Sequence, residues 1–123
     1  MTLREVDICV IGGGSGGLSV AAGAVQMGAS VALFEQNAMG GDCLNHGCVP
    51  SKALLAAAKA AASVVGAGAF GVDAELNAID RRRLAAHVRG VIAAIAPHDS
   101  VARFTRLGVE VISAAGRFVD ART

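Results

Sequence analysis

The sequence lacks tryptophan and tyrosine, and only four phenylalanines supply large aromatic side chains. Its hydrophobic share of 54% is therefore mainly aliphatic and rich in alanine, which predicts a small aliphatic core. Proline is scarce as well, with two residues against 16 glycines. Because the glycines gather at a few points between apolar runs, they indicate backbone turns and not a low-complexity linker. The length of 123 residues is that of a single domain.

An excess of charge of one sign is also absent. Eleven Lys and Arg residues against ten Asp and Glu give a net charge of +1, so no strong field favours nucleic acid or an anionic membrane as a partner. The one basic run, residues 81–83, is interpreted as a solvated helix face. Residues 1–7 show no pattern of a secretory signal, which makes the cytoplasm the expected location. Residues 53–72 approach membrane-spanning length, but Lys59 interrupts them, so we expect a packed soluble helix.

The first third of the chain has the pattern of an α/β fold. Residues 6–11 are β-branched and apolar and stop at three glycines, which predicts a buried parallel strand. Apolar residues recur at helical spacing over residues 14–27, and residues 30–34 form a second apolar run. Together they predict one right-handed, Rossmann-like βαβ unit.

Additional elements are expected along the rest of the chain. They are an alanine-rich helix to about Val65, a helix that Asp80 caps and that ends near Ile95, a short helix over residues 100–107, a strand over residues 109–112 and one arm of a hairpin over residues 117–119. The sequence then stops at Thr123 with no partner for the hairpin arm. We therefore expect an incomplete domain.

The three glycines after the first strand form a G-x-G-x-x-G pattern. In this position Gly12 permits a tight turn, Gly14 lets the backbone approach a pyrophosphate, and Gly17 lets the helix pack closely on the strand. The first N–H groups of the helix and its dipole then face an anion. Glu35 follows Gly17 by 18 residues, at the end of the second strand, where it could accept hydrogen bonds from both ribose hydroxyls of an adenosine.

A simpler interpretation of this pattern stays open. The glycines could make only a tight turn, with Glu35 as an exposed charge at the strand end. The motif alone also does not separate FAD from NAD.

Cys43 and Cys48 lie five positions apart in the segment GGDCLNHGCVPSK. In a regular helix this step rises about 7.5 Å, which exceeds the roughly 4.4–6.8 Å between Cα atoms in a disulfide. Gly47 and Pro50 are the residues where the backbone could depart from that geometry. Because Cys48 precedes a long helix and Lys52 follows it by four residues, we expect a lowered pKa and a reactive thiolate at Cys48.

Other interpretations of the cysteines compete with redox chemistry. Zinc could be bound by Cys43, His46 and Cys48, although no clear fourth ligand follows. Both thiols could also be unpaired core residues. Cys9 lies among apolar neighbours in the first strand, where a buried, inert thiol is expected. His46 is interpreted as a loop residue and not as a catalytic base.

The opening VDICVIGGGSGGLSVAAGAVQMGASVALFE and the segment GGDCLNHGCVPSK resemble class I pyridine nucleotide-disulfide oxidoreductases, the group that contains dihydrolipoamide dehydrogenase, glutathione reductase and mercuric reductase. The resemblance covers nearly the whole chain, and the cysteine segment is its specific part. It implies that residues 1–123 are the N-terminal part of an FAD-binding domain that carries a redox-active disulfide. The NAD(P) and dimer-interface domains would lie outside this sequence.

The resemblance also implies the roles of individual residues. Electrons would pass from NAD(P)H to FAD and on to a Cys43–Cys48 disulfide, with Cys48 as the flavin-facing, charge-transfer thiolate and Cys43 as the sulfur that attacks the substrate. The substrate would be a small-molecule disulfide or mercuric ion, and the full-length protein a homodimer. The implied cofactor-binding residues are Gly12, Gly14, Ser15, Gly16, Gly17, Glu35, Gly41, Asp42, Lys52 and Gly116.

Two residues depart from the family pattern. Asp42 stands where threonine is commoner, which places an anion near the expected flavin, and His46 is an unusual residue between the cysteines. Two other classes of function remain as alternatives: a stand-alone FAD- or nucleotide-binding module without catalysis, and a structural or partner-binding piece that binds no ligand.

Overall fold

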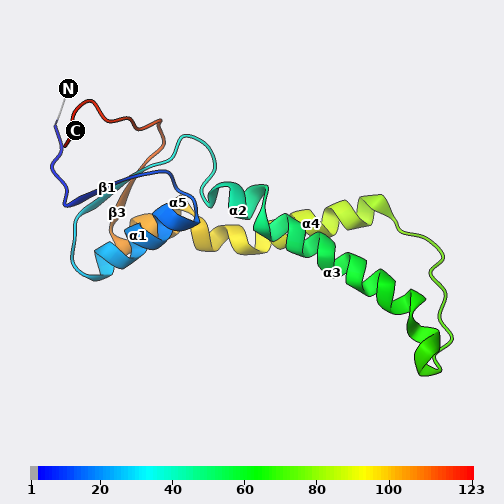
Figure 1. The fold of residues 1–123 in the computed structure, drawn as a ribbon. Helices are drawn as coiled ribbons and strands as arrows, with labels where there is room; N and C mark the ends of the chain where they lie inside the picture. The colour runs from blue at the N-terminus through cyan, green and yellow to red at the C-terminus, as the bar shows by residue number, and fades with distance from the viewer. Residues whose placement is uncertain (1–2) are drawn as a thin grey trace.

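A computed structural model describes residues 3–123 and shows a three-stranded parallel sheet with helices beside it (Figure 1). The strands β1 (Ile8–Ile11), β2 (Val31–Phe34) and β3 (Val109–Ile112) are neighbours in this order. Ile8 pairs with Val31, and Val31 pairs with Val109. Because the strands are parallel, their carboxyl ends meet at one edge of the sheet. The predicted α/β class is confirmed. The strands predicted over residues 6–11 and 30–34 are present with shorter bounds, and the strand predicted over residues 109–112 has the predicted bounds.

The helices occupy the two connections between the strands. The helix α1 (Ser15–Gln26) joins β1 to β2. Six elements join β2 to β3, namely α2 (Gly41–Asn45), α3 (Cys48–Val65), the 3₁₀ helix η1 (Ala67–Phe70), α4 (Arg81–Ile95), the 3₁₀ helix η2 (Ala96–Asp99) and α5 (Val101–Leu107). The helices predicted up to Val65, from Asp80 to Ile95 and over residues 100–107 are therefore present.

The core lies where α1 and α5 pack against the sheet. Leu18 and Ala21 of α1 are buried against Leu33 of the central strand, and Val109 of β3 is buried beside Phe104 of α5. Phe104 is 1% exposed and is the one fully buried phenylalanine of the described residues. The small aliphatic core that the composition predicts is thus built around a single aromatic anchor.

Local signals in the sequence fix the ends of the helices. Asp80 accepts hydrogen bonds from the backbone N–H groups of Arg82 and Arg83, as an N-terminal capping residue does. Ser100 caps α5 in the same way. Gly108 ends α5 in the left-handed conformation, with φ of 100°, and leads directly into β3.

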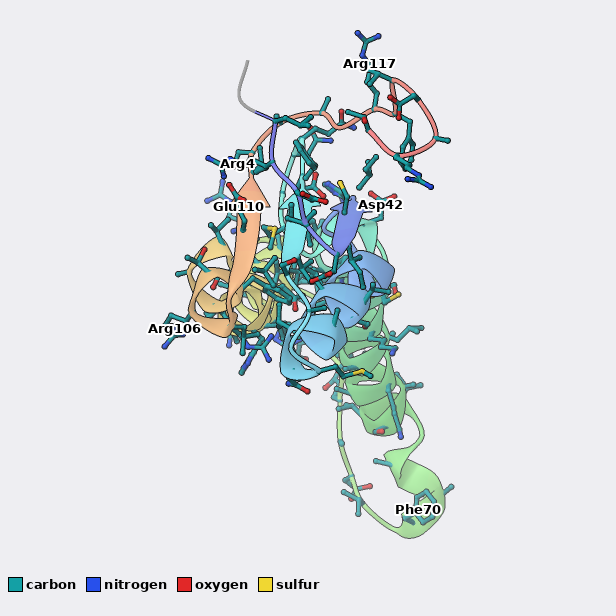
Figure 2. The ribbon with its side chains drawn as sticks, turned by 90° about the vertical axis from the view of Figure 1, so that its left-hand side faces the viewer. Arg4, Asp42, Phe70, Arg106, Glu110 and Arg117 are labelled. Atoms are coloured by element: carbon teal, nitrogen blue, oxygen red, sulfur yellow. The ribbon has the colours of Figure 1, made fainter. Side chains whose placement is uncertain are left out.

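The start of β1 is joined to the start of β2 by polar side chains. The Asp7 carboxylate accepts hydrogen bonds from the Ser30 hydroxyl at 2.6 Å and from the Ser30 backbone N–H at 2.7 Å. The hydroxyl bond, followed by the backbone bond, lowers the pKa of Asp7. On the other side of the sheet, Arg4 forms an ion pair with Glu110 of β3 (Figure 2).

The helices α3 and α4 pack on each other and project away from the sheet (Figure 1). Among the described residues, α3 buries only Ala53 and α4 buries none. The expected packed helix is thus present as α3, which packs on α4, while its outer face is left uncovered by residues 3–123. Residues 41–65 are long and apolar enough to cross a membrane by length and composition alone. Arg81–Arg83 are exposed, as expected of a solvated face.

Two sequence-based expectations about strands are wrong. Residues 117–119 form no strand, because no extended segment within residues 3–123 lies beside them as a partner. Cys9 is exposed and not buried. It lies in β1, an edge strand of this sheet, and its side chain points to the face opposite Val10, which is the β1 residue that joins the core.

Candidate functional site

The glycine turn lies at the carboxyl end of β1. Gly12 has φ of +105°, a conformation that favours glycine, and its N–H donates a 2.8 Å hydrogen bond to the carbonyl oxygen of Phe34 in β2. A methyl group at Gly17 would overlap the carbonyl oxygen of Gly12. The predicted roles of a tight turn at Gly12 and of close packing at Gly17 are both confirmed.

The N-terminus of α1 has open hydrogen-bond donors. The N–H of Leu18 makes the first bond within the helix, to Gly14, so the preceding N–H groups of Ser15, Gly16 and Gly17 have no acceptor within the helix. The first turn contains no acidic residue, and no side chain caps it. Space is open around Gly14, where an added Cβ would meet nothing within 4 Å. This end of the helix is suited to an anionic group such as a pyrophosphate.

Glu35 stands beside the turn and is bound to it. One carboxylate oxygen accepts a 2.7 Å hydrogen bond from the N–H of Gly13, and the other accepts a 2.7 Å bond from the N–H of Asn37. An added Cβ at Gly13 would lie 3.0 Å from the Met39 sulfur and 3.2 Å from a Glu35 oxygen. Gly13 is not among the residues predicted from the sequence. The run of three consecutive glycines was the signal that could have identified it.

A cavity of about 150 Å³ opens at the carboxyl edge of the sheet. It is lined by Ile11, Gly12, Phe34, Glu35, Gln36, Ala114, Ala115 and Gly116. Gly116 lies against Phe34, since an added Cβ would be 3.1 Å from the Phe34 Cβ. Gly12, Glu35 and Gly116, which the sequence analysis assigned to one nucleotide, therefore line the same cavity. In parallel α/β sheets this edge is where nucleotides bind.

A larger hollow, of about 460 Å³, lies at the far end of α3 and contains none of the predicted site residues. Its lining includes Lys59 and Phe70, and Figure 2 shows Phe70 at the tip of the projecting helices, far from Asp42. The smaller cavity is the better candidate for a nucleotide because it combines a carboxylate, a glycine turn and strand ends.

The cysteine segment begins directly on the glycine turn. Gly40 and Gly41 both have positive φ, of 90° and 57°. The N–H of Gly40 donates a 2.8 Å hydrogen bond to the carbonyl oxygen of Gly13, and an added Cβ at Gly41 would lie 2.8 Å from the Gly14 Cα. The two motifs that the sequence analysis treated separately are therefore in backbone contact.

A break between two helices places the cysteines. Cys43 lies within α2, and Cys48 is the first residue of α3. The chain departs from helical geometry at Gly47, with φ of −117° and ψ of −104°. Pro50 lies inside the first turn of α3, where a missing N–H costs no hydrogen bond, so it does not bend the backbone. Of the two proposed breaking points, Gly47 is confirmed and Pro50 is wrong.

The two thiols interact with each other. The pKa of the Cys43 thiol is raised, chiefly because its S–H donates a hydrogen bond to the Cys48 sulfur, with desolvation as the next cause. The positive charge of Lys52 acts weakly in the opposite direction. Cys43 is half-buried and Cys48 is exposed. The Cys48 sulfur and the Lys52 ammonium group therefore lie close enough to Cys43 to affect its pKa.

The remaining predicted residues lie around this pair. Asp42 is exposed in the first turn of α2, and Figure 2 shows it on the side of the carboxyl edge of the sheet. His46 is exposed, and its backbone N–H donates a 2.9 Å hydrogen bond to the carbonyl oxygen of Asp42. Among residues 3–123, no three His, Cys, Asp or Glu side chains gather closely enough to hold a metal ion.

Residues 6–121 match the sequence profile of the family described as pyridine nucleotide-disulphide oxidoreductase. The chain belongs to this family. The match includes both the glycine turn and the cysteine segment, so the family assignment rests on nearly the whole chain.

Relatives within the pyridine nucleotide-disulphide oxidoreductase family include several dihydrolipoyl dehydrogenases. The enzyme of Acholeplasma laidlawii is 48% identical over 70 residues, which are 57% of this chain and 21% of that protein. Dihydrolipoyl dehydrogenase 2 of Haloarcula marismortui is 36% identical over 115 residues, 93% of this chain and 24% of that protein. The Synechocystis enzyme is 34% identical over 116 residues, 92% of this chain. The chain thus spans about a quarter or less of the length of these relatives.

Proposed function

We propose that this chain supplies the FAD-binding turn and the redox-active cysteine pair of an NAD(P)H-dependent disulfide oxidoreductase. The observation that carries the proposal is the hydrogen bond from Gly40 to Gly13, which fixes the cysteine segment on the glycine turn. A cofactor whose diphosphate rests on that turn would extend toward the segment that holds the two sulfurs. We also propose that the full-length protein is a homodimer in the cytoplasm.

The residues of the turn fit the ADP half of FAD. The free N–H groups of Ser15 and Gly16 would donate to the diphosphate, and the open space at Gly14 would admit it. Glu35 would accept hydrogen bonds from the ribose, since each carboxylate oxygen has a further lone pair beyond the bond that it already accepts. Gly116 would lie beside the adenine in the 150 Å³ cavity.

The residues of the cysteine segment fit the flavin half of FAD. Gly41 and Asp42 would lie near the diphosphate and the flavin, and Lys52 would lie near the ring. When bound, FAD would take an electron pair from NAD(P)H and pass it to the cysteine pair. With that electron pair and two protons, a Cys43–Cys48 disulfide would open to two thiols.

The chemistry of the thiols follows from their contact. The Cys43 thiolate would attack one sulfur of a substrate disulfide and release the other substrate sulfur as a thiolate, which takes up a proton. The Cys48 thiolate would then attack the Cys43 sulfur, release the second substrate thiolate and re-form the intramolecular disulfide. Two electrons thus pass to the substrate in each cycle. Lys52 would favour the thiolate form of Cys43.

Small-molecule disulfides of the lipoyl type are the proposed substrate class, because the relatives named above are dihydrolipoyl dehydrogenases. Mercuric ion is the competing substrate. To compare them, NADH and NADPH oxidation by the full-length gene product would be measured with lipoamide, with glutathione disulfide and with mercuric ion.

The proposal is tested by purifying the full-length gene product and recording its absorption spectrum. We expect a yellow protein with bound flavin, in which anaerobic NADH or NADPH exposes two additional thiols to alkylation. Bound flavin with no change in thiol number would instead support a nucleotide-binding module without catalysis. A colourless protein with two freely alkylated thiols would overturn the proposal.

Replacement of Cys43 by serine separates binding from catalysis. Cys43→Ser should abolish disulfide reduction and retain FAD, because the proposed flavin contacts come from the turn and not from this sulfur. Loss of FAD in this variant would contradict the assigned role of Cys43. The Cys9→Ser variant is the matched control, since Cys9 lies on the exposed side of β1 and should leave activity unchanged.

A further inference from the structure

The amide of Asn45 spans the start of the short helix that holds Cys43. Asn45 is the last residue of α2 and is half-buried. Its side-chain nitrogen donates a 2.9 Å hydrogen bond to the carbonyl oxygen of Gly41 and a 3.2 Å bond to that of Met39. No other side chain of residues 3–123 donates to these two carbonyl groups. The sequence analysis and the proposed function assign Asn45 no role.

The two acceptors flank the segment that touches the glycine turn. Gly40 lies between Met39 and Gly41, and its N–H is the group that donates to Gly13. Gly40 is also the N-terminal capping residue of α2, and it offers no side chain for capping. The Asn45 amide therefore joins the far end of α2 to the loop through which α2 contacts the glycine turn.

The orientation of α2 decides where the Cys43 sulfur lies. A helix of five residues is too short to be stable by itself, so it depends on contacts at its ends. Leu44 supplies a buried apolar contact at 3% exposure, and the Asn45 amide supplies the polar one. Cys48 belongs to α3, on the other side of the break at Gly47, so a different helix sets its position.

We propose that Asn45 is a positioning residue, which holds α2 on the glycine turn so that the Cys43 sulfur meets the Cys48 sulfur. This inference rests on the proposed function, because a geometry set for disulfide formation matters only if the pair cycles. Loss of the amide donors would release the end of α2 from Met39, so that α2 could rotate on the glycine turn. Formation of the disulfide would then become less favourable.

Two substitutions remove different numbers of the hydrogen bonds that the Asn45 amide donates. Asn45→Leu keeps the approximate shape of the side chain and removes both donors. Asn45→Ser should keep the bond to Gly41, because serines in this chain donate to the carbonyl group four residues earlier, as Ser19 does to Ser15 and Ser63 to Lys59. It is too short to retain the bond to Met39.

The experiment measures the equilibrium constant of the Cys43–Cys48 disulfide in the full-length gene product. Buffers of reduced and oxidised glutathione set the redox potential. Alkylation followed by mass spectrometry of the Cys43 and Cys48 peptides gives the fractions of protein in the dithiol and disulfide forms. We expect the constant to fall about tenfold in Asn45→Leu, equivalent to about 30 mV, and about threefold in Asn45→Ser. The pH midpoint of Cys43 alkylation should also fall in Asn45→Leu, because the Cys48 thiol that raises the Cys43 pKa moves away.

Asn77→Leu is the matched control, because Asn77 lies in an exposed loop remote from the cysteines, and it should leave both measurements unchanged. Unchanged constants in both Asn45 variants would overturn the inference while leaving the proposed function intact. If Asn45→Leu does not fold, the disulfide equilibrium constant of Asn45→Ser alone tests the inference. Failure of both variants to fold would also overturn the inference, because Asn45 would then support the whole fold. A wild-type protein that forms no Cys43–Cys48 disulfide at any glutathione ratio would instead refute the proposed function.

Discussion

The backbone N–H of Gly40 donates a 2.8 Å hydrogen bond to the carbonyl oxygen of Gly13. Gly13 in turn donates its own N–H to Glu35. A continuous path of backbone and carboxylate hydrogen bonds therefore links the end of β2, the glycine turn and the segment that leads into α2. Changes at this junction should affect nucleotide binding and cysteine geometry together, whereas equivalent changes elsewhere should affect neither.

Gly41→Ala should weaken FAD binding and destabilise the fold. At φ of +57° the new Cβ would lie 2.8 Å from the Gly14 Cα, which is backbone and cannot turn aside. We expect a loss of about 1–3 kcal/mol in the free energy of unfolding and loss of flavin during gel filtration. Gly71→Ala is the control, since Gly71 also has positive φ, of 75°, but lies in open space. The free energy of unfolding of Gly71→Ala should fall by only about 1 kcal/mol, and this variant should retain flavin. Equal effects in the two variants would contradict the role of the junction.

Gly17→Ala tests the packing of α1 on the turn. The added methyl group would overlap the Gly12 carbonyl oxygen, so α1 must shift at a cost of about 1–3 kcal/mol in the free energy of unfolding. Gly23→Ala, in the same helix and with no atom within 4 Å of the new Cβ, should instead stabilise the protein by up to about 1 kcal/mol. Urea unfolding of the two variants gives the comparison. A Gly17→Ala protein as stable as wild type would rule out the close approach.

Cys48→Ala should lower the pKa of Cys43. The Cys48 thiol is the main cause of the raised value, so its removal increases the fraction of Cys43 thiolate at any pH below the wild-type pKa. The alkylation rate of Cys43 in reduced protein, measured by peptide mass spectrometry against pH, should therefore reach its midpoint at a lower pH. Cys9→Ala should leave the profile in place. A midpoint that stays at the wild-type pH in Cys48→Ala would mean that the thiols do not touch.

The Asp7 carboxylate should make stability depend on pH in the acid range. Its folded-state pKa lies below the ordinary value of 3.8 because of the bonds from Ser30, so its contribution is present above pH 3.8 and is lost as the pH falls through the lowered value. Asp7→Asn should thus be less stable than wild type at pH 7. The difference should shrink below pH 3.8 in urea unfolding measurements. A difference that is constant across this range would show that the charge contributes nothing.

The sequence predicted the elements whose causes are local. Asp80 begins a helix through its capping side chain, and Gly108 ends one through its left-handed backbone. Gly17 indicates close packing because a larger residue would overlap the Gly12 carbonyl oxygen. The same holds for the break at Gly47. These signals lie within a few residues of the structure that they determine.

Features that depend on distant neighbours could not be predicted in this way. Cys9 is exposed because β1 is an edge of the sheet and no segment within residues 3–123 covers its outer face, which no property of residues 6–11 reveals. The bond between Gly13 and Glu35 joins residues 22 positions apart. A hairpin arm at residues 117–119 required a partner strand, and its own residues, Arg117, Phe118 and Val119, carried no information about one.

The projecting pair of α3 and α4 has a consequence for cooperativity. With only Ala53 buried in the two helices, their amide protons should exchange with solvent through local opening, while those of β2 should exchange only when the sheet itself unfolds. Because the α2 segment lies between these two regions, fraying that starts at the tip near Phe70 has to pass along α3 before it reaches Cys48. Because α3 is long, local opening at the tip should leave the cysteine pair folded.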